Sequence, residues 1–299
     1  MTKRTLILGC GYVGQALAEE ALQSGFEVIA VTRNLETLAD LNRLGCQVVA
    51  AQVESDTWHA QATGEFDLAI NCVSSAGNGL EGYRQSYVGG NHSFVAWLNK
   101  VSVGRAIFTS SVSVYPDSGG EWVSETDAAP NNDRGKIILE AENIFLNSDV
   151  SSTRKCILRL GGIYGPQRHM LLNKSRLAPE EIPGIGTYYL NLIRLEDICS
   201  SIWSVYKCAA LEGRSIFNVV DDDPVFKLDL VNWFADQLGH PRPRFIASKN
   251  PNNSSRRFAG ESPSNRRIRN CALKKKCNWE PRFHSFKEGF SSFLKEVDV

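Results

Sequence analysis

Short apolar runs alternate with amphipathic segments through the first half of the chain. The apolar runs resemble buried strands bounded by turn residues, and the amphipathic segments follow the 3.6-residue period of helices. We expect strands at residues 6–8, 26–32, 47–52, 68–73, 106–110 and 155–160. We expect helices at residues 15–22, 35–44, 83–100 and 136–147. This alternation predicts an α/β fold with a doubly wound parallel sheet, because right-handed crossovers place helices on both faces.

The alternation weakens beyond the Gly165-Pro166 pair. Proline, glycine and asparagine become frequent, and two helices stand out, at 228–238 and 285–294. We interpret residues 1–165 as a sheet-centred domain and residues 166–299 as mainly a smaller C-terminal substrate lobe. A strand near 215–220 is expected to return to the sheet, so that the two parts are interleaved. The stretch 250–265, rich in Asn, Ser and Arg, is expected to be a mobile loop.

Composition and charge argue against several classes of partner. The chain has 299 residues, 42% of them hydrophobic and 22% charged, with a formal net charge of +0. Such a chain has no overall basic field to attract nucleic acid or an anionic membrane. We interpret the basic run from Arg266 to Lys276 as a solvated surface. No apolar stretch is long enough to span a membrane, and the first is too short for a secretory signal, so we expect a cytoplasmic protein.

The cysteines and histidines lack the spacing of a metal site. The eight cysteines form no Cys-x-x-Cys pair and lie mostly in apolar runs, and the five histidines are scattered. We therefore expect reduced, buried thiols rather than disulfides, and chemistry without a metal ion.

A glycine-rich hexapeptide follows the first apolar run and opens the first amphipathic segment. It reads Gly9-Cys10-Gly11-Tyr12-Val13-Gly14. Its G-x-G-x-x-G spacing is specific in this strand–turn–helix context. The first glycine permits a tight turn, the second lets the backbone approach a pyrophosphate, and the third lets helix and strand pack closely. Because a helix N-terminus favours phosphate, we predict that the hexapeptide binds a dinucleotide; the alternative is a glycine-rich turn without a ligand.

Four later segments resemble one family, in the order of that family. They are FTSSVSVY at 108–115, LRLGGIYGP at 158–166, NLIRLEDI at 191–198 and FNVVD at 217–221. They resemble landmarks of the extended short-chain dehydrogenases/reductases, the NAD(P)-dependent epimerase/dehydratase group. The glycine spacing and region 264–267 are similar to the atypical, YeeZ-like subset. The resemblance implies a Rossmann-type fold and nicotinamide-dependent chemistry on a small molecule, with a nucleotide sugar as one candidate.

The family uses a serine, and a tyrosine and lysine in a Y-x-x-x-K pattern. Ser111 matches the serine, but the tyrosine and lysine are missing. One alignment of the following helix places Arg134 and Ile138 at their positions, and the other places Asn132 and Lys136 there. Because a guanidinium stays protonated and an amide does not titrate, neither alignment supplies the proton-exchanging phenol.

Two other phenols are candidates for the missing proton donor. The resemblance places Tyr115 and Tyr164 in segments that end near the cofactor, where the alternative role is packing below the nicotinamide pocket. Arg134 is a further candidate catalytic residue, beside Ser111. Together with Lys136 it is a candidate anchor for an anionic group, the alternative being two solvated residues at a helix start.

The end of the second strand bears on the choice of cofactor. Thr32 takes the position where NAD enzymes have an acidic residue, and Arg33 follows it. A carboxylate there would repel a 2′-phosphate, whereas a guanidinium would bind it, so we predict NADP in preference to NAD. We assign further cofactor contacts to Asn34, Ser74, Ser110 and Lys136.

Two functions stay open at this point. The first is an NADP-dependent epimerase/dehydratase or oxidoreductase with displaced catalytic groups. The second is a catalytically inactive, NADP-binding sensor or scaffold similar to NmrA-like regulators. The expected partner is a small-molecule substrate, with a homodimer as the candidate assembly and no nucleic acid or membrane.

Overall fold

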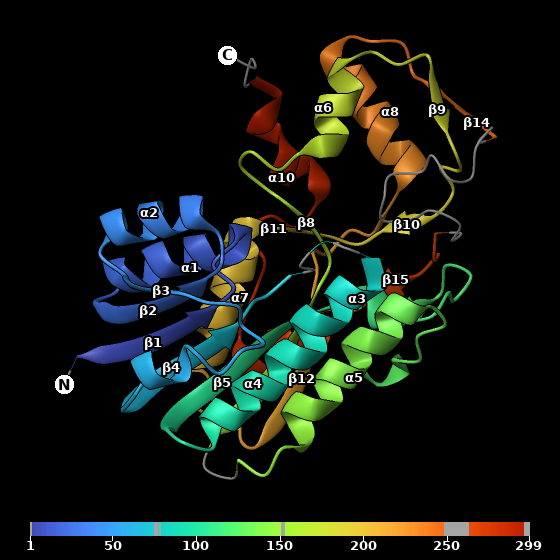
Figure 1. Cartoon of the computed structure of the whole chain (residues 1–299). Coiled ribbons are helices and arrows are strands. Elements are labelled where there is room, and N and C mark those ends of the chain that lie inside the picture. The colour runs from blue at the N-terminus through green and yellow to red at the C-terminus, as the bar shows by residue number, and fades with distance from the viewer. Residues whose placement is uncertain (1, 75–76, 78, 151–152, 248–262, 296–299) are drawn as a thin grey trace.

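A seven-stranded sheet forms the centre of the computed structural model, which describes residues 2–74, 77, 79–150, 153–247 and 263–295 (Figure 1). Its strands are β1 (Lys3–Leu8), β2 (Phe26–Thr32), β3 (Gln47–Ala50), β4 (Glu65–Asn71), β5 (Ser102–Ser111), β7 (Arg154–Leu160) and β12 (Arg214–Val219). They lie in the order β12-β7-β5-β4-β1-β2-β3, and all neighbours are parallel. The order runs outward from β1 and β4, and it is beyond the carboxyl ends of the strands at such a switch point that doubly wound sheets bind ligands. The predicted Rossmann-type, doubly wound sheet is confirmed.

Helices cover both faces of this sheet (Figure 1). They are α1 (Tyr12–Gln23), α2 (Leu35–Leu44), α4 (Gly90–Leu98), α5 (Asp133–Asn147), α7 (Leu195–Lys207) and α9 (Cys271–Cys277). Successive strand side chains point to opposite faces. Leu6 and Leu8 therefore pack in one core with α4 and α5, while Ile7 packs in the other with α1 and α7. Apolar runs rather than alternating patterns result, because both faces are buried.

A smaller lobe follows the carboxyl ends of β7 and β12 along the chain (Figure 1). It contains α6 (Met170–Arg176), α8 (Lys227–Leu238), α10 (Phe286–Ser291), β9 (Glu181–Pro183) and β14 (Arg244–Ile246). Its core is aromatic, with the rings of Phe234 and Phe290 4.9 Å apart. The expected strand near 215–220 is β12, which pairs with β7 in the central sheet. Segments beyond residue 166 thus contribute to both parts, and the division at 165/166 stays a prediction.

Short elements connect the sheet and the lobe. The strands among them are β6 (Trp122–Val123), β8 (Gly162–Tyr164), β10 (Tyr189–Leu190), β11 (Leu192–Arg194), β13 (Val225–Phe226) and β15 (Arg267–Ile268). The helical turns are η1 (His59–Gln61), α3 (Gly79–Tyr83), η3 (Val112–Val114), η4 (Glu125–Asp127) and η6 (Phe293–Lys295). A π-helical stretch, η2 (Arg84–Gly89), separates α3 from α4. The helix expected at 83–100 is therefore present to Leu98, with a π-helical first part.

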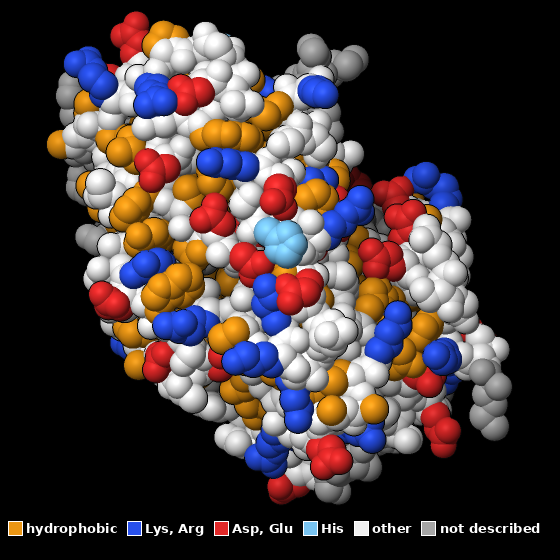
Figure 2. Space-filling view, turned by 180° about the vertical axis from the view of Figure 1, so that it is seen from behind, with side chains coloured by type: hydrophobic (Ala, Val, Ile, Leu, Met, Phe, Trp, Pro, Cys, Tyr) orange, Lys and Arg blue, Asp and Glu red, His pale blue; other side chains and the backbone are white. Residues whose placement is uncertain are grey.

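The surface and the thiols test other expectations. Figure 2 shows acidic and basic side chains intermixed over one face. Four of the eight free cysteines are buried, at 10, 46, 156 and 199; Cys271 is exposed and the rest are half-buried. Within the described part of the chain, no helix is both long and apolar enough to cross a membrane. Most of the loop expected at 250–265 lies outside the described residues.

A buried ion pair joins the sheet to α5. Arg159 of β7 donates from Nη2 to Glu142 Oε2 at 2.7 Å and from Nε to Oε1 at 3.0 Å, and their side chains are 2% and 1% exposed. Ser110 donates to the same Oε1 at 2.5 Å. Arg159 Nη1 also donates to Tyr115 Oη at 2.9 Å, and that hydroxyl donates to Asn218 Oδ1 at 2.6 Å. Charges withdrawn from water need this degree of pairing.

Replacement of Glu142 by alanine is expected to lower the free energy of unfolding by about 3–5 kcal/mol, because it leaves the Arg159 guanidinium buried without a counter-ion. The measurement is urea unfolding followed by circular dichroism. Glu140→Ala is the matched control, since that carboxylate pairs with Arg84 on the surface, where the loss should be about 0–1 kcal/mol. Equal losses in the two variants would contradict the assignment.

Candidate functional site

In the glycine turn at the end of β1, packing requires a glycine at two positions but not at the third. Gly9 has φ +82°, and a Cβ there would lie 2.7 Å from the Val73 Cα. A Cβ on Gly14 would lie 2.6 Å from the carbonyl oxygen of Gly9. Gly11, by contrast, has open space at its Cβ position and precedes the first residue of α1. The turn thus leaves room for a ligand at the positive end of the helix.

Tyr12 joins this turn to the beginning of the lobe. Its hydroxyl donates to the Pro166 carbonyl at 2.8 Å, and the Arg168 guanidinium lies 5.2 Å from its ring centre. Gly165 is needed here, because a Cβ at that position would lie 2.5 Å from Tyr12 Oη. Burial raises the pKa of Tyr12 to about 12. The side chain therefore acts as a neutral link between the turn and residues 165–168.

At the end of β2, the side chains of Thr32 and Asn34 accept hydrogen bonds from nearby backbone N–H groups, whereas that of Arg33 makes no such bond within the described part of the chain. The Thr32 hydroxyl accepts from the Asn34 N–H at 3.2 Å, and Asn34 Oδ1 caps α2 by accepting from the Glu36 N–H at 3.0 Å. Arg33 is exposed and has no ion pair or hydrogen bond with any described residue. Its guanidinium is available to an anion at this edge.

The remaining positions of the predicted cofactor site differ in access. The side chains of Cys10 and Val13 are buried in the core, so they offer a ligand only their backbone. Ser74 is exposed just beyond β4. Its cofactor contact stays a prediction.

Ser111 lies in a turn that prepares its hydroxyl as a donor. Its Oγ accepts from the Ser113 N–H at 3.2 Å and from the Ser113 hydroxyl at 3.0 Å. The side chain is only half-buried. Because both donors of Ser113 point to this oxygen, the proton of Ser111 is directed elsewhere, as a substrate oxygen would require.

The N-terminus of α5 packs against the turn formed by residues 111–116, which we call the serine turn. Asn132 caps the helix by accepting from the Gly135 N–H at 2.8 Å, so it has a structural role. A Cβ on Gly135 would lie 2.5 Å from the Ser113 carbonyl oxygen. The Arg134 guanidinium lies 5.4 Å from the ring centre of Tyr83. The N-terminus of α5 thus carries Arg134 beside a half-buried phenol, Tyr83, which was not among the residues singled out from the sequence.

The two residues that the alignments place at the family's lysine position, Ile138 and Lys136, differ in their surroundings. Ile138 is buried in the core and carries no charge. Lys136 is exposed, pairs with Asp133 at 3.3 Å, and lines a surface groove with Leu139 and Glu140. This position on the outer side of α5 argues against its predicted cofactor contact.

Three predicted site residues lie inside the molecule. Ser110 is buried and donates to Glu142, so its hydroxyl is already used. Tyr115 is fully buried, and desolvation raises its pKa to about 12 despite the opposing effect of Arg159. Tyr164 stacks on Phe290 at 4.3 Å, and burial raises its pKa as well. This geometry favours the packing role that was the alternative for both phenols, and it corrects the direct contact expected of Ser110.

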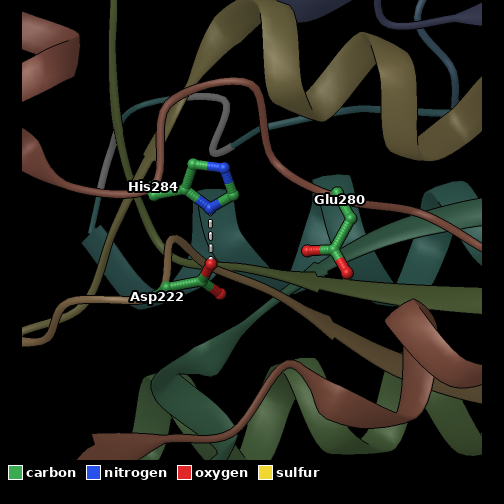
Figure 3. Close-up of side chains that lie close together, drawn as sticks. All are labelled: Asp222, Glu280 and His284. Atoms are coloured by element: carbon green, nitrogen blue, oxygen red, sulfur yellow. Dashed lines mark hydrogen bonds and ion pairs between the residues drawn. The ribbon is translucent and has the colours of Figure 1, made fainter.

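One cluster outside this edge has metal-ligating side chains. Asp222, Glu280 and His284 bring their ligand atoms within 4.8 Å of one another (Figure 3). His284 Nδ1 lies 2.8 Å from Asp222, which raises the pKa of the imidazole. The Lys274 ammonium lies 3.0 Å from both oxygens of Asp222 and 2.5 Å from Glu280. Because Lys274 forms ion pairs with both carboxylates, we interpret the cluster as an ion-pair network.

The parallel sheet, its switch point and the glycine turn define a Rossmann-type protein. The family model for the NAD dependent epimerase/dehydratase family matches residues 5–213. The chain belongs to this family, so the predicted membership in the extended, atypical short-chain dehydrogenases/reductases is confirmed.

Relatives and solved structures agree with this placement. The chain is 27% identical over 224 residues to Protein YeeZ of Escherichia coli (strain K12), covering 73% of this chain and 77% of that one. Sterol-4-alpha-carboxylate 3-dehydrogenase, decarboxylating, of Dictyostelium discoideum is 21% identical over 179 residues, 54% of each chain. A structure described as MoeE5 in complex with UDP-glucuronic acid and NAD has a TM-score of 0.80, with 18% identity and 98% of each chain covered. At this identity, the structural likeness shows the fold alone.

The glycine turn leads to a prediction with an internal control. Gly14→Ala should lower the free energy of unfolding by about 1–3 kcal/mol, because the new methyl group overlaps the Gly9 carbonyl. Gly11→Ala should change it by no more than about 0.5 kcal/mol, yet weaken dinucleotide binding by filling the approach to the turn. Urea unfolding and NADPH fluorescence titration measure the two effects. Unchanged NADPH affinity in Gly11→Ala would contradict the proposed site.

Proposed function

We propose that this protein is an NADP-binding epimerase/dehydratase-like oxidoreductase that acts on a small molecule, with a nucleotide sugar as one candidate class. The observation that carries this proposal is the glycine turn. Packing accounts for Gly9 and Gly14, whereas the open position at Gly11 is accounted for by a bound pyrophosphate. The family membership supports the same cofactor class.

The proposed choice of NADP rests on the end of β2. Thr32 offers no carboxylate, so nothing at this position would hold the ribose hydroxyls of NAD or repel a 2′-phosphate. The exposed Arg33 is placed one residue later with its guanidinium available. Arginine binds phosphate through two parallel hydrogen bonds, which makes it suited to this group.

The wild-type protein is expected to bind NADPH at least about tenfold more tightly than NADH, since a hydrogen-bonded charge pair is worth about 1.5–3 kcal/mol. Arg33→Ala should remove most of this preference and leave NADH affinity unchanged. Fluorescence titration of both cofactors checks this, with Arg43→Ala on the last turn of α2 as the control. Equal affinities in the wild type would refute the phosphate assignment, and binding of neither cofactor would refute the whole proposal.

The proposed chemistry assigns an oxygen-orienting role to Ser111 and a proton-donating role to Tyr83. A bound nicotinamide would exchange a hydride with the substrate carbon. The Ser111 hydroxyl, with its proton directed outward, would hold the substrate oxygen. Tyr83 replaces our earlier candidates, Tyr115 and Tyr164, because it is half-buried beside Arg134 while they are enclosed. The π-helical stretch that follows Tyr83 is a feature often found at functional sites.

Removal of the Ser111 or the Tyr83 hydroxyl is expected to lower turnover about a hundredfold or more, which is the loss typical of a group that takes part in proton transfer. NADPH affinity should be unchanged. The measurement is NADPH absorbance with a panel of sugar nucleotides, aldehydes and ketones, comparing Ser111→Ala and Tyr83→Phe with wild type. Tyr206→Phe is the control phenol, since its ring packs edge to face against Phe26, at the start of β2 and away from this edge. Full activity in Tyr83→Phe would show that the proton comes from another group.

The alternative function is an inactive NADP-binding sensor or scaffold. It is favoured by one observation. In the alignment that places Arg134 at the tyrosine position, the lysine position holds Ile138, which is buried and uncharged. Tight NADPH binding without turnover of any compound in the panel would support it.

Assembly and location are also proposals. We propose a homodimer through the exposed side of α5, where a surface groove is lined by Pro130, Leu139 and Ile144. We propose a cytoplasmic location and the division into residues 1–165 and 166–299. Light scattering measures the oligomeric state directly.

A further inference from the structure

We propose that Arg266 is a receptor for an oxyanion, a carboxylate or phosphate carried by the substrate, at the turn that follows Ser111. This inference rests on the proposed function and deepens it by naming the charge of the substrate. Arg266 lies directly before β15, 154 residues beyond its contact at Val112.

The guanidinium of Arg266 is held against the serine turn. Its Nη2 donates to the Val112 carbonyl at 3.1 Å and its Nη1 to the Pro116 carbonyl at 3.3 Å. Val112 is the residue next to Ser111. The cation therefore lies at the turn that carries the hydroxyl that we assign to the substrate oxygen.

The backbone around Arg266 is fixed from two sides. Asn191 Nδ2 donates to the Arg266 carbonyl at 3.0 Å, and Asn191 Oδ1 accepts from the Ile268 N–H at 2.8 Å. On the other side, the Asn265 carbonyl accepts from the Gly120 N–H at 2.9 Å. A side chain on so well anchored a segment loses little further freedom when a ligand binds.

Arg266 is desolvated without a counter-ion. No carboxylate among the described residues lies within 4 Å of it, and Asp117, the acid that acts on it electrostatically, is engaged with the Gly119 N–H at 2.8 Å. Desolvation lowers the pKa of Arg266 to about 10, so the group stays protonated at neutral pH. A desolvated charge of this kind favours an anionic partner.

The buried arginines of the molecule show what is missing at the half-buried Arg266. Arg159 and Arg194 each bind a carboxylate, at 2.7 Å and 2.9 Å. Arg105 binds carbonyls at the C-terminus of α7, where the helix dipole supplies negative charge. Arg266 has only the carbonyls of a turn, and two of its five N–H groups are used among the described residues.

The neighbouring arginines have different partners. Arg267 lies over the rings of Trp122 and Tyr189, at 5.1 and 5.2 Å, and Arg269 lies 5.2 Å from the Trp122 ring centre. Only Arg266 of these three donates to the serine turn. Its free N–H groups form a planar fork that matches carboxylate and phosphate oxygens.

Isothermal titration of the NADPH-loaded protein with inorganic phosphate and with malonate, at low ionic strength, tests the proposal. The loaded cofactor keeps the probes out of the glycine turn, and the two probes distinguish phosphate from carboxylate. We expect saturable binding of at least one probe, weakened about tenfold or more in Arg266→Gln. Arg266→Lys, which keeps the charge but loses the fork, should be weakened less.

Arg269→Gln is the matched control, because it removes the same charge from an exposed position in the same segment. Equal weakening in that variant, or no saturable binding by wild type, would overturn the proposal. Should Arg266→Gln not fold, phenylglyoxal labelling of wild type decides: the bound probe should protect Arg266, read by peptide mass spectrometry, and absence of protection would overturn the proposal. NADPH affinity, measured on the same samples, tests the proposed function separately.

Discussion

The ion pair between Arg159 and Glu142 holds the site edge together. Its two charges are almost completely withdrawn from water, so each must keep its partner. Ser110 binds the same carboxylate and Tyr115 the same guanidinium, which places the end of β5 and the start of the serine turn relative to α5. The geometry around Ser111 therefore depends on a pair that is out of reach of the substrate.

This framework is present although neither alignment of α5 with the family's Y-x-x-x-K pattern supplies its tyrosine. One alignment places Arg134 and Ile138 at the two positions, and the other places Asn132 and Lys136 there. Positive charge at this edge comes instead from different elements, with Arg33 after β2, Arg134 on α5 and Arg266 before β15. A site with its cations arranged in this way is suited to hold anionic groups, which is a different task from lowering the pKa of a phenol on the same helix.

The sheet and the lobe are coupled through a few polar contacts. Tyr12 of the glycine turn binds the Pro166 carbonyl, and Asn191 binds the segment that carries Arg266.

The sequence by itself determined the elements and the glycine turn, because their signals are local. The helix at 35–44 ends as expected at Gly45, whose φ of +102° few other residues adopt. Only the tertiary structure decided which polar side chains face solvent. Ser110 and Tyr115 were candidate site residues and proved to be buried, whereas Tyr83 and Arg266, which we propose as site residues, were not singled out for these roles from the sequence. The physical reason is that burial and access depend on packing between segments 50 to 150 residues apart, and no local period of the sequence records these contacts.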